Sequence, residues 1–135
     1  MSDRKPIVYV VDDDNSVCCG LTMLLRANGY AAHSFCSGHK FLAAGIPKSN
    51  ACIIVDYCMP DMDGFELKTA LDKSGCTAPV ILITALADSD IKDRARKAGM
   101  AGFLWKPMSG EALTTMIQKS MRKSNSDGSC CRKNV

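Results

Sequence analysis

Residues 51–64, Ala-Cys-Ile-Ile-Val-Asp-Tyr-Cys-Met-Pro-Asp-Met-Asp-Gly, join a short apolar run to a loop rich in turn-forming residues. Asp56 stands at the junction. This pattern is typical of a buried strand that ends in a loop carrying chemistry. Four similar apolar runs occur elsewhere in the chain, and segments with helical periodicity separate them. The four runs are 7–11, 30–35, 79–84 and 101–105.

This alternation predicts five β-α units and therefore an α/β fold. Nearly continuous apolar strands favour a parallel sheet that helices cover on both faces, because right-handed crossovers place helices above and below it. At 135 residues the chain has the length of one domain. The loops after parallel strands share one edge of the sheet, where ligands bind in such folds. We therefore expect the functional site at that edge.

Capping signals indicate where several of the helices begin and end. Asn28-Gly29 supplies a left-handed stop for the first helix. Asp63, with Glu66 three residues later, has the spacing of a capping box at the start of the third helix. Ser109 is available as the cap of the last helix.

The fourth predicted helix, residues 90–98, has a weak apolar stripe. Only Ile91, Ala95 and Ala98 form it, and basic residues surround them. Little apolar area is thus available to hold this segment against the sheet. We predict that it is the most mobile helix.

The composition excludes several functional classes. Of the 17 basic and 14 acidic residues, four basic residues and one acidic residue lie beyond Met121, so the preceding body is neutral. A neutral body argues against direct binding of nucleic acid. The eight cysteines include no C-x-x-C pair, which disfavours a zinc site, and without a signal peptide we expect reduced thiols in a cytoplasmic protein. No apolar stretch approaches the roughly 18 residues that span a membrane.

Polar or charged side chains stand at the ends of four predicted strands. They are Asp12 and Asp13 after 7–11, Asp56 after 51–55, Thr84 at the end of 79–84 and Lys106 after 101–105. Three carboxylates within a few ångströms repel one another unless a cation or a proton joins them. Oxygen ligands favour Mg²⁺, or Mn²⁺, over zinc. We expect Asp13 and Asp56 to be direct ligands, Asp12 to lie behind a water, and the carbonyl of Cys58 to be the neutral ligand.

The same edge has the groups that phosphoryl transfer needs. A carboxylate such as Asp56 can attack phosphorus and form an acyl phosphate, whose oxygens then require cations and hydrogen-bond donors. Lys106 supplies a positive charge and Thr84 a hydroxyl. Ala85 is small enough to let a backbone N–H approach the same phosphoryl group.

Each of these residues alone has a simpler interpretation. An acidic triplet such as 12–14 is commonly a solvated turn or a helix cap. Thr84 alone is typical of a strand, and Phe103 alone of a core. The cysteines are most simply small buried hydrophobic residues. The functional interpretation therefore depends on the combination.

Taken together, the motifs resemble the response-regulator receiver domains of two-component signalling over about residues 5–122. The matching motifs are Val11-Asp12-Asp13-Asp14, Asp56-x-x-Met59-Pro60-x-Met62-Asp63-Gly64, Thr84-Ala85, Ala98-Gly99-x-Ala101-Gly102-Phe103 and Lys106-Pro107.

The resemblance implies a three-layer flavodoxin-like (βα)5 fold with strand order 2-1-3-4-5. It also implies that Asp56 accepts a phosphoryl group from a phosphohistidine on a sensor histidine kinase or phosphotransfer protein. Thr84 and Phe103 would form the switch, in which the hydroxyl moves to the phosphate and the ring turns inward. The Lys106–Pro107 peptide bond would be cis. Such a domain is no enzyme in the usual sense, since it catalyses only its own phosphorylation and dephosphorylation.

We expect an N-terminal extension at 1–5, the receiver at 6–122 and a flexible basic tail at 123–135. The receiver stands alone or is a piece of a longer regulator. The resemblance also implies that a downstream protein or a second copy would bind the surface formed by the fourth helix, fifth strand and fifth helix. We expect no contact with membrane and no direct contact with nucleic acid. The alternative is an interaction domain with the same fold that works without phosphorylation. A hydrolase similar to haloacid-dehalogenase-like phosphatases would need an aspartate where this chain has Cys58.

Overall fold

The computed structural model describes residues 5–45, 50–86 and 88–134, with side chains as far as Arg122. The predicted N-terminal extension, apart from Lys5, lies outside the described residues. The side chains of the predicted flexible tail lie outside them too. Both of these predictions therefore stay untested.

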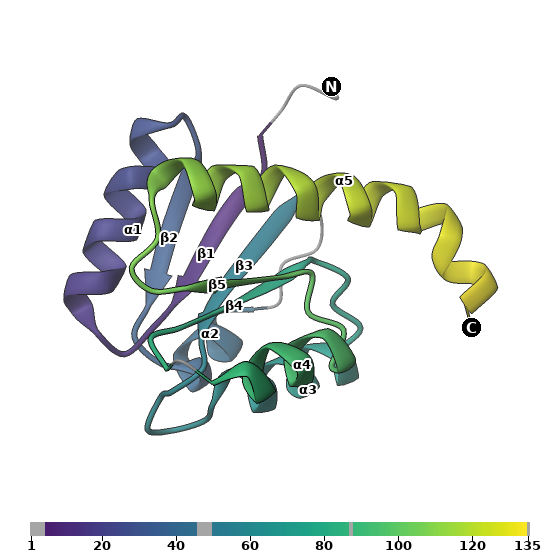
Figure 1. Ribbon diagram of the computed structural model, residues 1–135, viewed down its shortest axis with the longest axis horizontal. Helices are drawn as coiled ribbons and strands as arrows, with labels where there is room; N and C mark the ends of the chain where they lie inside the picture. The colour runs from purple at the N-terminus through teal and green to yellow at the C-terminus, as the bar shows by residue number, and fades with distance from the viewer. Residues whose placement is uncertain (1–4, 46–49, 87, 135) are drawn as a thin grey trace.

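In the part of the chain that the structure describes, five strands alternate with five helices, as the apolar runs predict (Figure 1). The strands are β1 (Ile7–Val11), β2 (Ala31–Phe35), β3 (Ala51–Asp56), β4 (Val80–Thr84) and β5 (Gly102–Trp105). The helices are α1 (Asn15–Ala27), α2 (Gly38–Ala44), α3 (Gly64–Lys73), α4 (Ser89–Lys97) and α5 (Gly110–Asn134).

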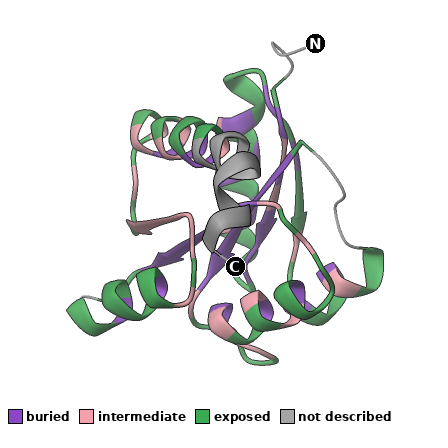
Figure 2. Ribbon diagram, turned by 90° about the vertical axis from the view of Figure 1, so that its right-hand side faces the viewer, coloured by how far each residue is buried: buried purple, intermediate pink, exposed green. Residues whose placement is uncertain are grey.

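The strands form one parallel sheet in the order β2-β1-β3-β4-β5, which confirms the predicted flavodoxin-like fold. Every residue of β3 and β4 is buried, as expected of central strands covered on both faces. Figure 2 shows these buried strands between helices whose outer sides are exposed. The sheet is thus the middle of three layers.

Two hydrophobic clusters fill the spaces above and below the sheet. One packs α1 and α5 against it and includes Leu25, Ile54 and Ile117. The other packs α2, α3 and α4 against the opposite face and includes Leu67 and Ile91. Alternate residues of each strand contribute to the two clusters, because neighbouring side chains in a strand point to opposite faces.

Three predicted helix boundaries are confirmed. Gly29 has a φ of 89° directly after the C-cap Asn28 of α1, a conformation that glycine adopts without strain. Asp63 and Glu66 form the reciprocal capping box, with both N–H to carboxylate distances at 2.8 Å. Ser109 Oγ accepts the N–H of Ala112 at 3.0 Å in the first turn of α5.

Helix α4 has the sparse anchor that its sequence predicts. Only Ile91 and Ala95 are buried, while Ala98 is half-buried beyond the end of the helix. Its mobility stays a prediction.

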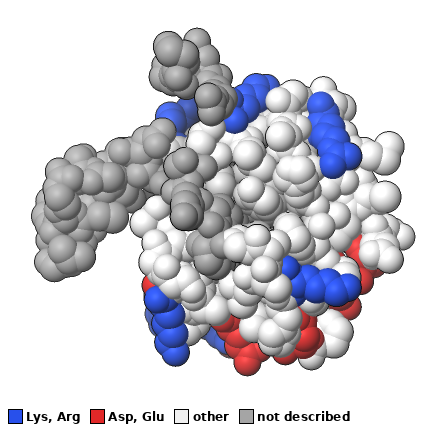
Figure 3. All heavy atoms as spheres, turned by 180° about the vertical axis from the view of Figure 1, so that it is seen from behind, with Lys and Arg blue, Asp and Glu red and all other residues white. Residues whose placement is uncertain are grey.

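Charged residues are dispersed over the rear of the molecule. Figure 3 shows Lys and Arg there as separate groups, with no continuous basic stripe among the described residues of that face. Among the described helices, none is both long and apolar enough to cross a membrane.

Candidate functional site

The chemically versatile side chains meet at the carboxyl edge of the sheet. Asp12 directly follows β1, Asp56 is the last residue of β3, Thr84 the last of β4, and Lys106 follows β5. The register of the parallel strands brings these positions together, because all four strands end on the same side.

Asp12, Asp13 and Asp56 form a compact acidic group. One carboxylate oxygen from each lies within 4.8 Å of the others. Asp12 and Asp56 are buried, whereas Asp13 is exposed and gives the group access to solvent. The sequence predicts this convergence, and these three residues could hold a metal ion.

Asp14 has a different role from its two neighbours. Its carboxylate caps α1 by accepting the N–H of Ser16 at 2.9 Å and that of Val17 at 3.4 Å. Its own N–H donates to Oδ1 of Asp12 at 3.0 Å and so fixes the orientation of the buried carboxylate. Within the acidic triplet, Asp14 is therefore a helix cap, whereas Asp12 and Asp13 belong to the group that could hold a metal ion.

Lys106 is the cation of the site. Its Nζ lies 2.9 Å from Oδ2 of Asp12 and 3.1 Å from Oδ1 of Asp56. Its backbone N–H donates to the carbonyl of Thr84 at 2.8 Å, and its peptide bond to Pro107 is cis. Burial lowers the pKa of Lys106, but the hydrogen bonds to the two carboxylates outweigh burial and raise it. The side chain is therefore held in its charged form.

The surroundings of Asp56 favour the protonated form of its carboxyl group. Burial, followed by the charge of Asp12, raises the pKa of Asp56 to about 6, although the hydrogen bond and charge of Lys106 act in the opposite direction. A single ammonium group thus does not fully compensate the acidic group. The remaining negative charge, together with oxygen-only donors, suits a hard divalent cation.

A shallow hollow of about 410 Å³ opens beside the acidic group. Asp13 lines one side of it, and the loop after β3 supplies the rest, including Tyr57, Cys58 and Asp63. The Cys58 side chain is exposed here. The role of its carbonyl as a ligand stays a prediction.

The predicted switch residues belong to β4 and β5, the two strands beyond β3 in the sheet. Thr84 is buried, and its Oγ1 accepts the N–H of Leu86 at 3.1 Å. Ala85, between them, is exposed. The half-buried Phe103 ring packs edge-on against Trp105, with 4.7 Å between ring centroids. Their functions as switch and phosphate-binding residues stay predictions.

Two contacts of the loop after β3 were not found by sequence reasoning. His39, at the start of α2, donates its backbone N–H to Oδ2 of Asp61 at 3.1 Å, and its Nδ1 lies 2.7 Å from the same oxygen. The second contact joins Arg94 of α4 to the Tyr57 and Phe65 rings. Both link residues far apart in the chain, so no local spacing indicates them.

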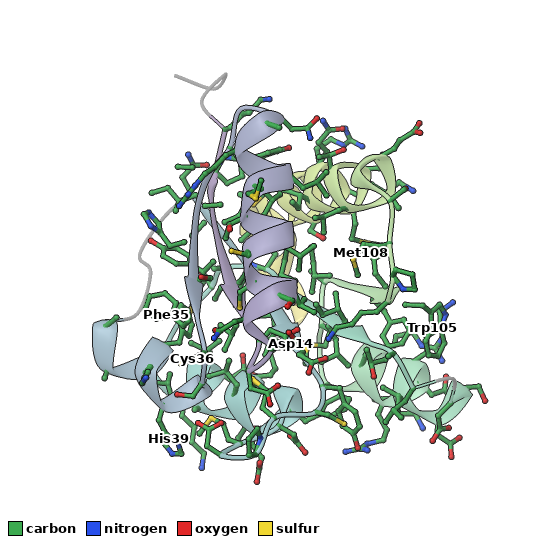
Figure 4. All side chains as sticks on the ribbon, turned by 90° about the vertical axis from the view of Figure 1, so that its left-hand side faces the viewer. Asp14, Phe35, Cys36, His39, Trp105 and Met108 are labelled. Carbon is green, nitrogen blue, oxygen red and sulfur yellow. The ribbon has the colours of Figure 1, made fainter. Side chains whose placement is uncertain are left out.

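Figure 4 shows how these parts lie around α1. Asp14 stands at the beginning of the helix, between Cys36 and His39 on the β2 side and Trp105 on the β5 side. The acidic group therefore has α2 on one flank and β5 on the other.

Comparison with known proteins agrees with this geometry. The family model of the response regulator receiver domain matches residues 8–118. The transcriptional regulatory protein FixJ of Azorhizobium caulinodans is 36% identical over 121 residues, which are 90% of this chain and 57% of FixJ. The response regulator protein TodT of Pseudomonas putida is 34% identical over 122 residues, 90% of this chain and 54% of TodT. The chain thus spans a little over half the length of these relatives.

A solved structure has the same fold and related sequence. The crystal structure of FixJ-N has a TM-score of 0.80 and 32% identity, covering 87% of this chain and 94% of that one. Family match, sequence identity, sheet order and acidic group all agree, and this chain belongs to the response regulator receiver domain family.

Proposed function

We propose that this receiver accepts a phosphoryl group on Asp56 from a phosphohistidine of a sensor kinase or phosphotransfer protein, and that the reaction requires Mg²⁺. The observation that carries the proposal is the position of the buried Asp56 carboxylate, 3.1 Å from Lys106 Nζ and within 4.8 Å of two further carboxylates. Oxygen ligands of this kind favour Mg²⁺, with Mn²⁺ as a substitute.

Each residue of the site has a distinct task in this reaction. An Asp56 oxygen forms the new bond to phosphorus, while the N–P bond of the phosphohistidine breaks and its electron pair returns to the imidazole. Asp13 and Asp56, with the Cys58 carbonyl, would hold the metal, and Asp12 would do so through a water. When bound, the cation neutralises charge on the phosphoryl oxygens.

Lys106 and the end of β4 would complete the phosphate site. The Lys106 ammonium already lies between two carboxylates, so a phosphoryl group on Asp56 gives it a further anionic partner. Thr84 Oγ1 would exchange its contact with the Leu86 N–H for one with the phosphate, and the Ala85 N–H would donate to another phosphoryl oxygen. The Phe103 ring would then turn inward.

Membership of the family supports a proposal for the output. The surface of α4, β5 and α5 would change on phosphorylation and control a downstream protein, a second copy or an output domain. Because the FixJ relative is named a transcriptional regulatory protein and is longer than this chain, transcriptional control by a longer protein is one form of that output. We propose a cytoplasmic location and no direct contact of the receiver with nucleic acid or membrane.

Trp105 provides the test, because it is the only tryptophan and precedes Lys106. Its fluorescence should change with Mg²⁺ and change again, with saturation, when a small acyl-phosphate donor is added. Intact mass should rise by one phosphoryl group, and Asp56→Ala should abolish both the rise and the donor response. Mg²⁺ binding with no gain of mass would contradict phosphorylation and favour an interaction domain with the same fold.

A further inference from the structure

The side chain of Arg94 leaves α4 and lies over two aromatic rings of the neighbouring segment. Its guanidinium carbon is 4.3 Å from the centroid of the Phe65 ring in α3 and 5.9 Å from that of Tyr57. Its Nη1 also donates to the Tyr57 hydroxyl at 3.4 Å. The two rings meet edge to face, with centroids 5.6 Å apart. A guanidinium over aromatic faces is a favourable cation–π arrangement.

Tyr57 connects this stack to the phosphoacceptor, because it directly follows Asp56. Its N–H donates to the carbonyl of Ile83 at 2.9 Å, and its carbonyl accepts the N–H of Gly64 at 3.1 Å. These hydrogen bonds fix the backbone of Tyr57, while the contacts with Phe65 and Arg94 hold its ring. The same residue lines the hollow beside the acidic group.

The stacking of Arg94 on Phe65 and Tyr57 is important to α4 because few other side chains fasten this helix to the rest of the protein. Its buried residues are Ile91 and Ala95, and alanine buries little apolar area. The other arginine of the helix, Arg96, pairs with Asp93 of the same helix at 2.6 Å, so that ion pair does not fasten α4 to the rest of the protein.

We propose that Arg94 is a positioning residue, which holds α4 against the loop after the phosphoacceptor by stacking on Phe65 and Tyr57. The position of the loop and the position of α4 are then coupled through this stack, on the side of the site away from α1. This coupling goes beyond the proposed phosphorylation and exists in the unphosphorylated protein. A change in the position of the loop can shift the equilibrium position of α4 only by as much as the free energy of the stack differs between the two loop positions.

Arg94→Met and Arg96→Met are matched variants for the test. Both remove a charge from the same helix and introduce a residue of similar helix propensity. Hydrogen exchange followed by mass spectrometry should show about two- to fivefold faster exchange in residues 89–97 for Arg94→Met, as expected from losing an exposed cation–π contact. The loop at 57–63 should also exchange faster. Arg96→Met should leave the loop unchanged.

The loop distinguishes coupling from a general weakening of α4. Faster exchange confined to 89–97, or equal effects of the two variants on the loop, would overturn the proposal. Phe65→Leu should reproduce the effect of Arg94→Met, and the double variant should add little, because both changes remove the same stack. Full additivity would also contradict it. The measurements use unphosphorylated protein, so their outcome is independent of whether Asp56 accepts phosphate.

Discussion

Helices α1 and α4 both follow strands that end at the functional site, yet the protein anchors them very differently. Helix α1 has 13 residues and follows Asp12 and Asp13, whereas α4 has nine and follows the loop after Thr84. The buried residues of α4 are Ile91 and Ala95. Those of α1 are Cys18, Leu21, Thr22 and Leu25.

The difference predicts that the site has a fixed side, next to α1, and a movable side, next to α4. The carboxylates on the α1 side cannot easily move apart, because the helix behind them is firmly packed. On the β4 side, the helix that follows Thr84 is α4, which has little buried apolar area. Moving α4 therefore costs less free energy than moving α1. A receiver built in this way can hold its acidic group constant while α4 changes position.

The largest expected effect comes from truncating the core contacts of the two helices. Leu25 is fully buried, and Leu25→Ala should lower the free energy of unfolding by about 2–5 kcal/mol in urea titrations. Ile91→Ala removes a side chain that is 3% exposed, but should lower the global free energy of unfolding less if α4 opens on its own, as its sparse anchor predicts. Equal losses in the two variants would show that α4 is as firmly integrated as α1, and the comparison would fail.

The raised pKa of Asp56 predicts that the stability of the folded protein depends on pH. The folded protein raises the pKa of Asp56 from 3.8 to about 6, so protonated Asp56 favours folding. This stabilisation is fully present below pH 3.8 and is lost as the pH rises through 6, amounting to about 3 kcal/mol in metal-free protein. Urea titrations from pH 4 to 7.5 should therefore show wild type losing stability relative to Asp56→Asn. Parallel profiles would mean that the carboxylates separate after all.

Sequence reasoning predicts the fixed side well, for a physical reason. Parallel strands with continuous apolar runs must end at one edge, so Asp12, Asp56 and Lys106 have to approach one another once the five runs are recognised. The capping box of Asp63 and Glu66 depends on local spacing alone, and the structure confirms it.

Contacts between helices and loops far apart in the chain could not be predicted in the same way. Arg94 reaches Tyr57 across 37 residues, and His39 reaches Asp61 across 22. Both depend on how a helix lies beside a loop, which hydrophobic periodicity does not specify. The hydrogen bond from the Leu86 N–H to Thr84 Oγ1 depends in turn on the path of the loop.

On the α1 side, replacing Asp13 should have a smaller effect and should change metal binding and stability differently. Asp13 is exposed and contributes charge to the acidic group, so Asp13→Ala should weaken Mg²⁺ binding roughly tenfold, or about 1.4 kcal/mol. Without metal it should be as stable as wild type or more so, because one repelling charge is gone. Fluorescence titration of Trp105 with Mg²⁺ measures the first quantity and urea unfolding the second. Unchanged Mg²⁺ affinity would refute the assignment of Asp13 as a ligand.

The smallest expected effect gives the most direct comparison, because both helices begin at an aspartate cap. Asp14 accepts the N–H of Ser16, and Asp88 accepts that of Asp90, each at 2.9 Å. Replacing either with Ala removes one cap, worth about 1 kcal/mol. Asp14→Ala should lower the global unfolding free energy by this amount, because α1 unfolds only with the whole domain. Asp88→Ala should leave global unfolding unchanged and accelerate exchange only in residues 89–97, because we expect α4 to open separately from the core. If Asp88→Ala instead lowers global stability as much as Asp14→Ala, α4 belongs to the same cooperative unit as α1, and its motion would require partial unfolding of the core.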